Sequence, residues 1–158
     1  MVTINDSNTT PFQYLFDEDN NFSFTTISLT DDPFATLEVT LTVTNGTLTL
    51  GSLTGLTFTT GDGTEDTIIT FYGSLANVNN ALNSLLFNPN HDYNGNETLA
   101  VSVTSTVDDG INPPIITNAS QNVSLTINPV NDAPVLTPSG ILTSIADEDT
   151  LPVGAVGS

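Results

Sequence analysis

The feature that most constrains the fold is an alternation of apolar and polar residues over residues 37–44 that resumes at 47–50, in the segment LEVTLTVTNGTLTL. A period of two places alternate side chains on opposite faces of a β-strand, so this segment predicts strands with one buried face. Asn45-Gly46 divides the segment, and this dipeptide is typical of two-residue hairpin turns. The sequence therefore predicts two strands joined as a hairpin.

Further short segments of this kind occur along the chain, separated by turn residues such as Gly61-Asp62-Gly63 and Asp108-Asp109-Gly110. Many short strands with such spacing predict an all-β fold, an antiparallel β-sandwich of the immunoglobulin or cadherin type. We expect these additional strands at residues 22–29, 56–60, 67–72, 98–107 and 123–127.

One segment departs from the β pattern. Leu75, Val78, Leu82 and Leu85 are spaced three and four residues apart, which indicates a short helix. Ser74 is a suitable N-cap, so we predict a helix over residues 76–84 that forms a crossover. The alternative is an irregular connection between the two sheets.

The charge of the chain is entirely one-sided: it has no Lys or Arg and 18 Asp and Glu residues, for a formal net charge of −18. Without basic side chains the protein cannot neutralise phosphates, so we expect neither nucleic-acid binding nor attachment to anionic membranes. No segment predicts a membrane span, and membrane insertion is not expected. Apart from His91, no side chain can pair with the acids, which favours balance by bound cations.

The two ends of the chain repeat each other. Asn5-Asp6 precedes Asp17-Glu18-Asp19, and Asn131-Asp132 precedes Asp147-Glu148-Asp149. Each copy is typical of a linker followed by the first strand of a domain. We therefore predict an N-terminal linker over residues 1–10, one sandwich over 11–128, and a linker with the truncated first strand of the next repeat over 129–158. The acids at 147–149 would serve that next repeat.

Four motifs carry a resemblance to a known family: VNDAPV at 130–135, DYNG at 92–95, DDG at 108–110 and DEDT at 147–150. With them, nearly the whole chain resembles the cadherin-like repeats of bacterial giant adhesins and related extracellular surface proteins. The resemblance implies a calcium-binding structural repeat that stiffens a multi-domain rod for cell adhesion at the cell surface, with neighbouring repeats of the same chain as partners. The N-terminal linker, NDSNTTP, departs from the NDAP pattern, which bears on the completeness of an upper metal site.

Calcium takes six to eight oxygen ligands, and the chain places its carboxylates mainly in turns and linkers. Because alternate loops of a sandwich gather at opposite ends, we expect two groups of ligands. The C-terminal group is Glu18 with Asp17 or Asp19, Asp92, Asn131 and Asp132; the N-terminal group is Asp6, Asp31, Asp32, Asp108 and Asp109. The alternative is that these are ordinary turn residues bonded to their own backbone.

An enzyme is not expected, because the chain has one His and neither Cys nor Lys to act as nucleophile or base. The runner-up function is a carbohydrate-binding, lectin-like module, with Tyr14, Phe16, Tyr72 and Tyr93 as a sugar platform. Homophilic and carbohydrate contacts are thus the partners considered beyond neighbouring repeats.

Overall fold

The protein's structure is a computed structural model that describes residues 1–134. The predicted truncated strand, with Asp147, Glu148 and Asp149, lies outside the described residues. The elements follow one another as β1 (Thr3–Asp6), β2 (Gln13–Asp17), β3 (Phe22–Phe24), β4 (Ile27–Thr30), β5 (Thr36–Thr42), β6 (Gly46–Thr49), β7 (Thr57–Thr60), β8 (Ile68–Ser74), α1 (Leu75–Leu82), β9 (Leu85–Pro89), β10 (Gly95–Val107) and β11 (Ile115–Asn128).

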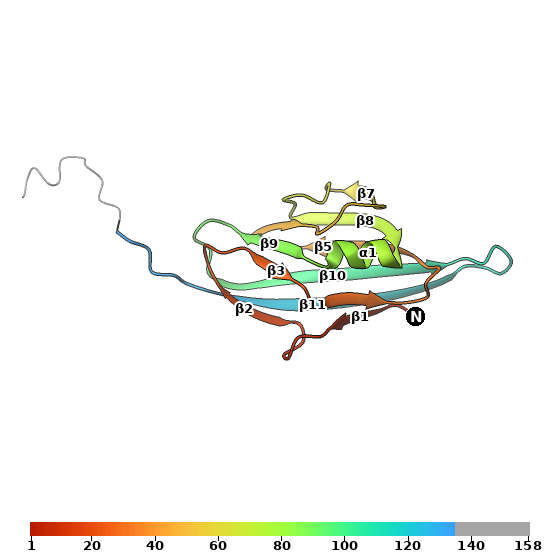
Figure 1. Cartoon of the computed structure of the whole chain (residues 1–158), viewed down its shortest axis with the longest axis horizontal. Coiled ribbons are helices and arrows are strands. Elements are labelled where there is room, and N and C mark those ends of the chain that lie inside the picture. Colours follow the sequence, from red (N-terminus) through yellow and green to blue (C-terminus); the bar gives the residue numbers. More distant parts are fainter. Residues whose placement is uncertain (135–158) are drawn as a thin grey trace, which may run out of the picture.

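The strands form two packed layers, as the sequence predicted (Figure 1). One layer is a six-stranded sheet in the order β2-β11-β10-β5-β8-β7. The other consists of the three-stranded sheet β3-β9-β6 and the pair β1-β4, together with α1. Neighbouring strands are antiparallel except β2 and β11, which run parallel at one edge. The fold is an all-β sandwich with one short helix in a crossover.

The apolar side chains of residues 37–50 face the core as predicted, but the predicted hairpin between the two strands is wrong. β5 pairs with β10 and β8, whereas β6 pairs with β9 in the opposite layer. The chain crosses between layers at Asn45-Gly46, so both strands still bury their apolar faces. Gly46 serves close packing here: an added Cβ would lie 2.5 Å from the carbonyl oxygen of Asn88 on β9.

The first residues belong to the sandwich rather than to a linker. β1 pairs with β4, from Thr3 opposite Thr30 to Asp6 opposite Ile27, and Val2 is buried in the core. The chain then passes through residues 7–12 to the other layer, where β2 pairs with β11. The first strand is therefore divided between the two sheets. After β11, residues 129–134 contain no strand; the linker expected from residue 129 stays a prediction.

The helix forms where the spacing predicts it and joins the two layers, running from β8 to β9. The Ser74 hydroxyl accepts a hydrogen bond from the backbone N–H of Asn77 at 3.2 Å, which confirms the N-cap. The helix ends two residues before the predicted Ser84, because Ser84 has a positive φ of 74° that an α-helix cannot accommodate.

Candidate metal centre

The loops of the sandwich gather at two ends, which we call the exit pole and the hairpin pole. The exit pole comprises residues 17–20, 88–94 and 129–132, where the chain leaves β11 (Figure 1). The hairpin pole comprises Met1 and residues 31–35 and 108–114, the last of these joining β10 to β11. The ordering of the strands thus separates the acids into two groups.

Glu18 is the anchor of the exit pole. It follows β2, and its backbone N–H donates to the carbonyl of Asn128 at 2.9 Å, which extends the pairing of β2 with β11. The side chain is only 3% exposed. Its carboxylate accepts hydrogen bonds from the backbone N–H of Val130 at 2.8 Å and from Asn94 Nδ2 at 3.2 and 3.3 Å. Glu18 therefore ties the outgoing chain and the 88–94 loop to the end of the first strand.

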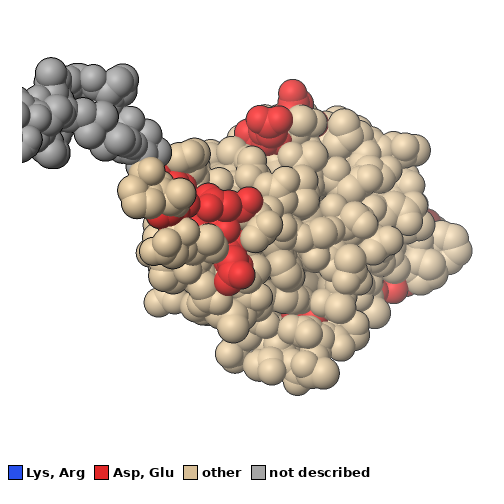
Figure 2. All heavy atoms as spheres, turned by 60° about the vertical axis from the view of Figure 1, so that its left-hand side comes forward, with Lys and Arg blue, Asp and Glu red and all other residues tan. Residues whose placement is uncertain are grey.

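Three more carboxylates lie around this anchor. Partial loss of hydration raises the pKa of the exposed Asp19, and the negative charges of Asp132, Glu18 and Asp92 raise it further, against a smaller opposing effect of His91. These acids are therefore close enough to repel one another, although they come from three separate parts of the chain. Figure 2 shows acidic side chains gathered beside the outgoing chain, with no basic side chain among them.

The remaining predicted residues of this pole lie at its periphery. Asp17 lies on β2, and its Oδ1 accepts a hydrogen bond from Asn128 Nδ2 at 3.1 Å. Asn131 is exposed in the outgoing chain next to Asp132. His91 is an exposed loop residue, as its sequence context suggests, and its Nδ1 lies 2.9 Å from Asp92 Oδ2.

A polar pocket of about 340 Å³ opens beside Asp19. Its walls are made by residues of the 88–94 loop together with Asp19, namely Asn88, Pro89, Asn90 and His91. Carboxylate and amide oxygens are the ligands that calcium prefers. The pocket thus leaves room for a cation and its waters next to the carboxylate of Asp19.

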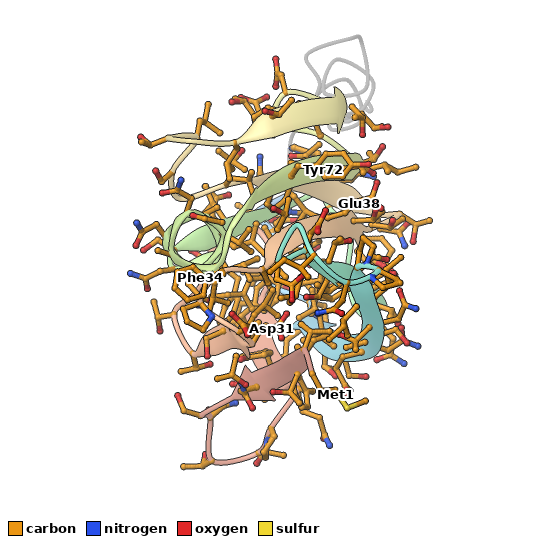
Figure 3. All side chains as sticks on the ribbon, turned by 90° about the vertical axis from the view of Figure 1, so that its right-hand side faces the viewer. Met1, Asp31, Phe34, Glu38 and Tyr72 are labelled. Carbon is orange, nitrogen blue, oxygen red and sulfur yellow. The ribbon has the colours of Figure 1, made fainter. Side chains whose placement is uncertain are left out.

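The hairpin pole contains a buried acid, Asp31, whose side chain is 1% exposed. Its Oδ1 lies 3.5 Å from the terminal ammonium of Met1. Burial works to raise the pKa of Asp31, but the hydroxyl of Ser105, the backbone of Asp32 and the ammonium outweigh it and leave the pKa lowered. Figure 3 looks onto this end, with Asp31 inside and Phe34 in the loop beside it.

The carboxylates of the other acids at the hairpin pole accept hydrogen bonds from backbone N–H groups of their own turns. Asp32 Oδ1 accepts from the backbone N–H of Phe34 at 2.8 Å, and Asp108 Oδ1 accepts from that of Gly110 at 2.8 Å. Asp109 accepts from the backbone of Ile111 and Asn112, and such bonds lower its pKa to about 2. These contacts agree with the turn-residue interpretation that the sequence left open.

Asp6 lies apart from both groups. It is the last residue of β1, whereas Thr3 near the hairpin pole is the first, and the two are roughly 10 Å apart along the strand. Both of its oxygens are occupied: Oδ1 accepts from Asn8 N and Thr26 Oγ1, and Oδ2 accepts from Phe12 N and Tyr14 OH, all within 3.0 Å. Asp6 therefore fixes the crossing of the first strand between the layers and is not brought to the hairpin pole.

Within residues 1–134, no three acidic or imidazole side chains converge closely enough to hold a metal ion as they stand. The exit pole fits calcium by its oxygen donors and its uncompensated charge, and Asp19, Asp92 and Asp132 are exposed enough to rotate. The hairpin pole fits less well, since most of its carboxylates are already bonded to their own backbone.

The structure also assigns roles to residues that sequence reasoning missed. Asn94 was seen only as part of a turn, but it binds Glu18. Glu97 precedes the predicted strand 98–107 but lies inside β10; it is 4% exposed and accepts hydrogen bonds from Thr44 N and Thr44 Oγ1, both at 3.1 Å, and from Asn45 N. The only available signal was an acid at an inward-facing position of an alternating strand.

The four aromatic residues of the lectin alternative do not share one surface. The rings of Tyr14 and Phe16 pack against Phe22 inside the sandwich. Tyr72 lies on the outer face of the six-stranded sheet, where its hydroxyl donates to Glu38 Oε2 at 2.5 Å (Figure 3). Tyr93 donates to the carbonyl of Asn96 at the exit pole.

Comparison of the chain with protein-family models, with curated proteins and with solved structures found no match. Among the described residues, no helix has both the length and the apolar character needed to cross a membrane.

Proposed function

We propose that this chain is a calcium-binding structural repeat of an extracellular, adhesin-type surface protein of bacterial character. In this proposal calcium at the exit pole fixes the direction in which the chain continues to the neighbouring repeat, and a series of such repeats forms a stiff rod for cell adhesion. The observation that carries the proposal is the placement of three acids around the buried Glu18, in a chain without a single basic side chain. Glu18 itself accepts hydrogen bonds from Val130 N and Asn94 Nδ2.

The arrangement of the exit pole gives the ion a structural effect. Asp132 comes from the outgoing chain, Asp92 from the loop before β10, and Asp19 from the end of the first strand. A divalent cation coordinated by these carboxylates would remove their repulsion and join the outgoing chain to the sandwich. Glu18, already bonded to Val130, defines where that chain begins. The residues that would hold the ion are therefore Asp19, Asp92 and Asp132, with Glu18 and Asn131 as further oxygen donors.

Calcium titration followed by calorimetry and thermal unfolding tests the proposal. Extracellular modules bind calcium with dissociation constants of about 10⁻⁴ to 10⁻³ M. A tenfold excess over such a constant stabilises the folded state by about 1.4 kcal/mol, so calcium should raise the melting temperature and a chelator should reverse the rise. A melting temperature that is the same in calcium and in chelator counts against the proposal.

A pair of charge-matched variants locates the ion. Asp19→Asn with Asp132→Asn should abolish most of the calcium response. Asp62→Asn with Glu65→Gln removes the same charge from the β7–β8 loop, at the far edge of the six-stranded sheet from β2, and should leave the response intact. An equal loss of response in both variants would indicate general screening of charge rather than a site.

A further inference from the structure

One edge of the six-stranded sheet is open along much of its length. β11 is the longest strand, with 14 residues, and pairs with β10 from Ile115 to Ile127. On its other side β2 covers only Ser124–Asn128. Within the described part of the chain, no strand pairs with residues 115–123 on that side. This leaves a free edge of nine residues, which we call the β11 edge.

The backbone groups on the β11 edge can be assigned from the neighbouring pairing. The N–H of Ser124 donates to the carbonyl of Phe12 at 2.8 Å, on the side of β2. Because backbone groups alternate in direction along a strand, the even-numbered residues Ile116, Asn118, Ser120 and Asn122 direct their N–H and C=O groups to the free side. The carbonyl of Asn122 accepts from the side chain of Gln121 at 2.9 Å.

The β11 edge lacks the devices that usually protect an exposed strand. Charged side chains, prolines and bulges are the common forms of protection, because an unprotected edge pairs readily with other strands. β7, at the opposite edge of the sheet, has four residues and an irregular register between Phe58 and Thr60. Residues 115–123 read IITNASQNV, with no charge and no proline, and their register with β10 is regular.

The neighbouring β1 does not occupy this edge. β1 pairs with β4 in the other layer and lies beside β11 without pairing with it. Val2, just before β1, donates its N–H to the inward-facing Thr117 Oγ1 at 3.3 Å. At the start of the edge, Ile115 and Ile116 are 65% and 61% exposed. The edge thus combines free backbone groups with apolar side chains in contact with water.

We propose that the β11 edge binds the same edge of a second copy of this chain, in antiparallel orientation. Full overlap of residues 115–123 places the two-fold axis at Ala119. Asn118 then pairs with Ser120 of the second copy, and Ile116 pairs with its Asn122, so that the outward backbone groups meet in hydrogen-bonded pairs. The two six-stranded sheets become one continuous sheet.

The β11 edge is the surface through which a second copy can approach despite the repulsion between the two molecules. Two molecules with a formal charge of −18 each repel, and they approach most easily through surfaces that carry no acid. The β11 edge is such a surface, and a two-fold contact makes every hydrogen bond twice. This pairing does not depend on calcium, because the edge contains none of the proposed ligands; the two proposals can therefore fail separately.

Cysteine cross-linking tests the register, since the chain has no Cys of its own. At the two-fold axis Ala119 faces its own copy in a non-hydrogen-bonded pair, where Cα atoms lie about 4.5 Å apart, within the range that a disulfide spans. Ala119→Cys should therefore form a covalent dimer under mild oxidation. Ala100→Cys, on the neighbouring strand β10 and inside the sheet, is the matched control and should remain monomeric.

Sedimentation of the full chain from micromolar to millimolar concentration tests the association itself. We expect a monomer–dimer equilibrium that shifts toward dimer at high NaCl, because salt screens the repulsion between the two copies. Asn118→Asp with Ser120→Asp places like charges opposite each other and should abolish the dimer. Ser102→Asp with Thr104→Asp, at the positions of β10 paired with those residues, adds the same charge away from the edge and should retain it.

Three results would overturn the proposal. The first is a wild-type chain that stays monomeric throughout in high salt. The second is a dimer that survives the edge variant. The third is equal cross-linking of Ala119→Cys and Ala100→Cys. If Asn118→Asp with Ser120→Asp abolished the dimer in that case, the β11 edge would bind some other segment of the second copy, and the proposed β11–β11 pairing would be wrong.

Discussion

At the scale of single residues, the carboxylates of this protein act mainly as acceptors for backbone and hydroxyl groups, because no basic side chain competes for them. Asp6 shows this most clearly. Burial alone would raise its pKa, but hydrogen bonds from Thr26, Phe12, Tyr14 and Asn8 outweigh burial and leave the pKa below 3.8. The ionised form is therefore the one that stabilises the first-strand crossing.

The lowered pKa of Asp6 makes a prediction about acid stability. A group whose pKa is lower in the folded state contributes stability above its unfolded value, here near 3.8, and loses it as pH falls through the folded value. Asp6→Asn should therefore lower the melting temperature at neutral pH, and the gap from wild type should narrow in acid. Melting temperatures measured from neutral to acid pH check this, and a constant gap would contradict the assignment.

Glu97 is a second residue whose carboxylate organises the backbone. It accepts from Thr44 and Asn45 where the chain crosses from β5 to β6, and from Thr98 N at 2.7 Å. Hydrogen bonds to a charged group contribute about 1.5–3 kcal/mol, and the unpaired N–H groups left behind add to the cost. Glu97→Ala should lower the free energy of unfolding by about 3 kcal/mol, as measured in urea.

Glu38 supplies the control for that prediction. It also lies on a central strand, but its side chain is on the outer face and bonds only the hydroxyl of Tyr72 among the described residues. Surface interactions of this kind contribute less than about 1 kcal/mol. If Glu38→Ala cost as much as Glu97→Ala, the position of Glu97 at the crossing would not explain its importance.

At the scale of elements, α1 does more than connect two strands. The side-chain amide of Asn79 makes the two hydrogen bonds that a neighbouring strand would make to Leu29. Its Oδ1 accepts from Leu29 N at 2.8 Å, and its Nδ2 donates to the Leu29 carbonyl at 3.0 Å. These two bonds satisfy backbone groups of β4 on the side away from β1. The helix therefore covers the edge of the β1-β4 pair that β4 presents.

This role predicts a difference between two neighbouring asparagines. Asn79→Ala removes both bonds and leaves two backbone groups of Leu29 without partners, which should cost about 2 kcal/mol of folding free energy. Asn80→Ala on the same helix removes an exposed side chain and should change stability by less than about 0.5 kcal/mol. Chemical denaturation of both variants measures the difference, and equal effects would show that helix propensity, rather than the amide pairing, decides.

Elements were predictable from the sequence where a local pattern sufficed, and not where long-range pairing decided. The alternation over 37–50 and the spacing of Leu75, Val78 and Leu82 record which side chains face the core, and those predictions are confirmed. The partner of each strand is not recorded in such a pattern. Asn45-Gly46 suits a hairpin turn equally well, but here Gly46 accommodates the close approach of β9.

The candidate site shows the same limit. The order of the strands brings Glu18, Asp19, Asp92 and Asp132 to one pole, which the alternation of loops between ends was enough to predict. Asp6 was misplaced because a linker was expected where β1 forms, and the four donors around its carboxylate come from residues 8–26 in their folded positions. Asn94 and Glu97 were overlooked because their partners lie more than 50 residues away in the chain.

At the scale of the whole molecule, the net charge of −18 opposes folding, because the compact state brings the acids closer together than the unfolded chain does. Screening by salt should relieve this repulsion for every acid, whereas a bound ion acts only where the acids converge. The two effects can be separated by comparing CaCl₂ with NaCl at equal ionic strength. NaCl should raise the melting temperature gradually, and calcium should add a further rise that saturates.

The further rise should depend on the exit pole and not on the total charge. In Asp19→Asn with Asp132→Asn, the response to NaCl should persist, and the saturating response to calcium should disappear. Removing two of 18 charges changes general screening little, but it removes two of the three exposed carboxylates that lie around Glu18 beside the outgoing chain. If the two salts gave coincident curves for the wild-type chain, its acids would act only as a diffuse charge, and stiffening of a rod by calcium at this pole would have no physical basis.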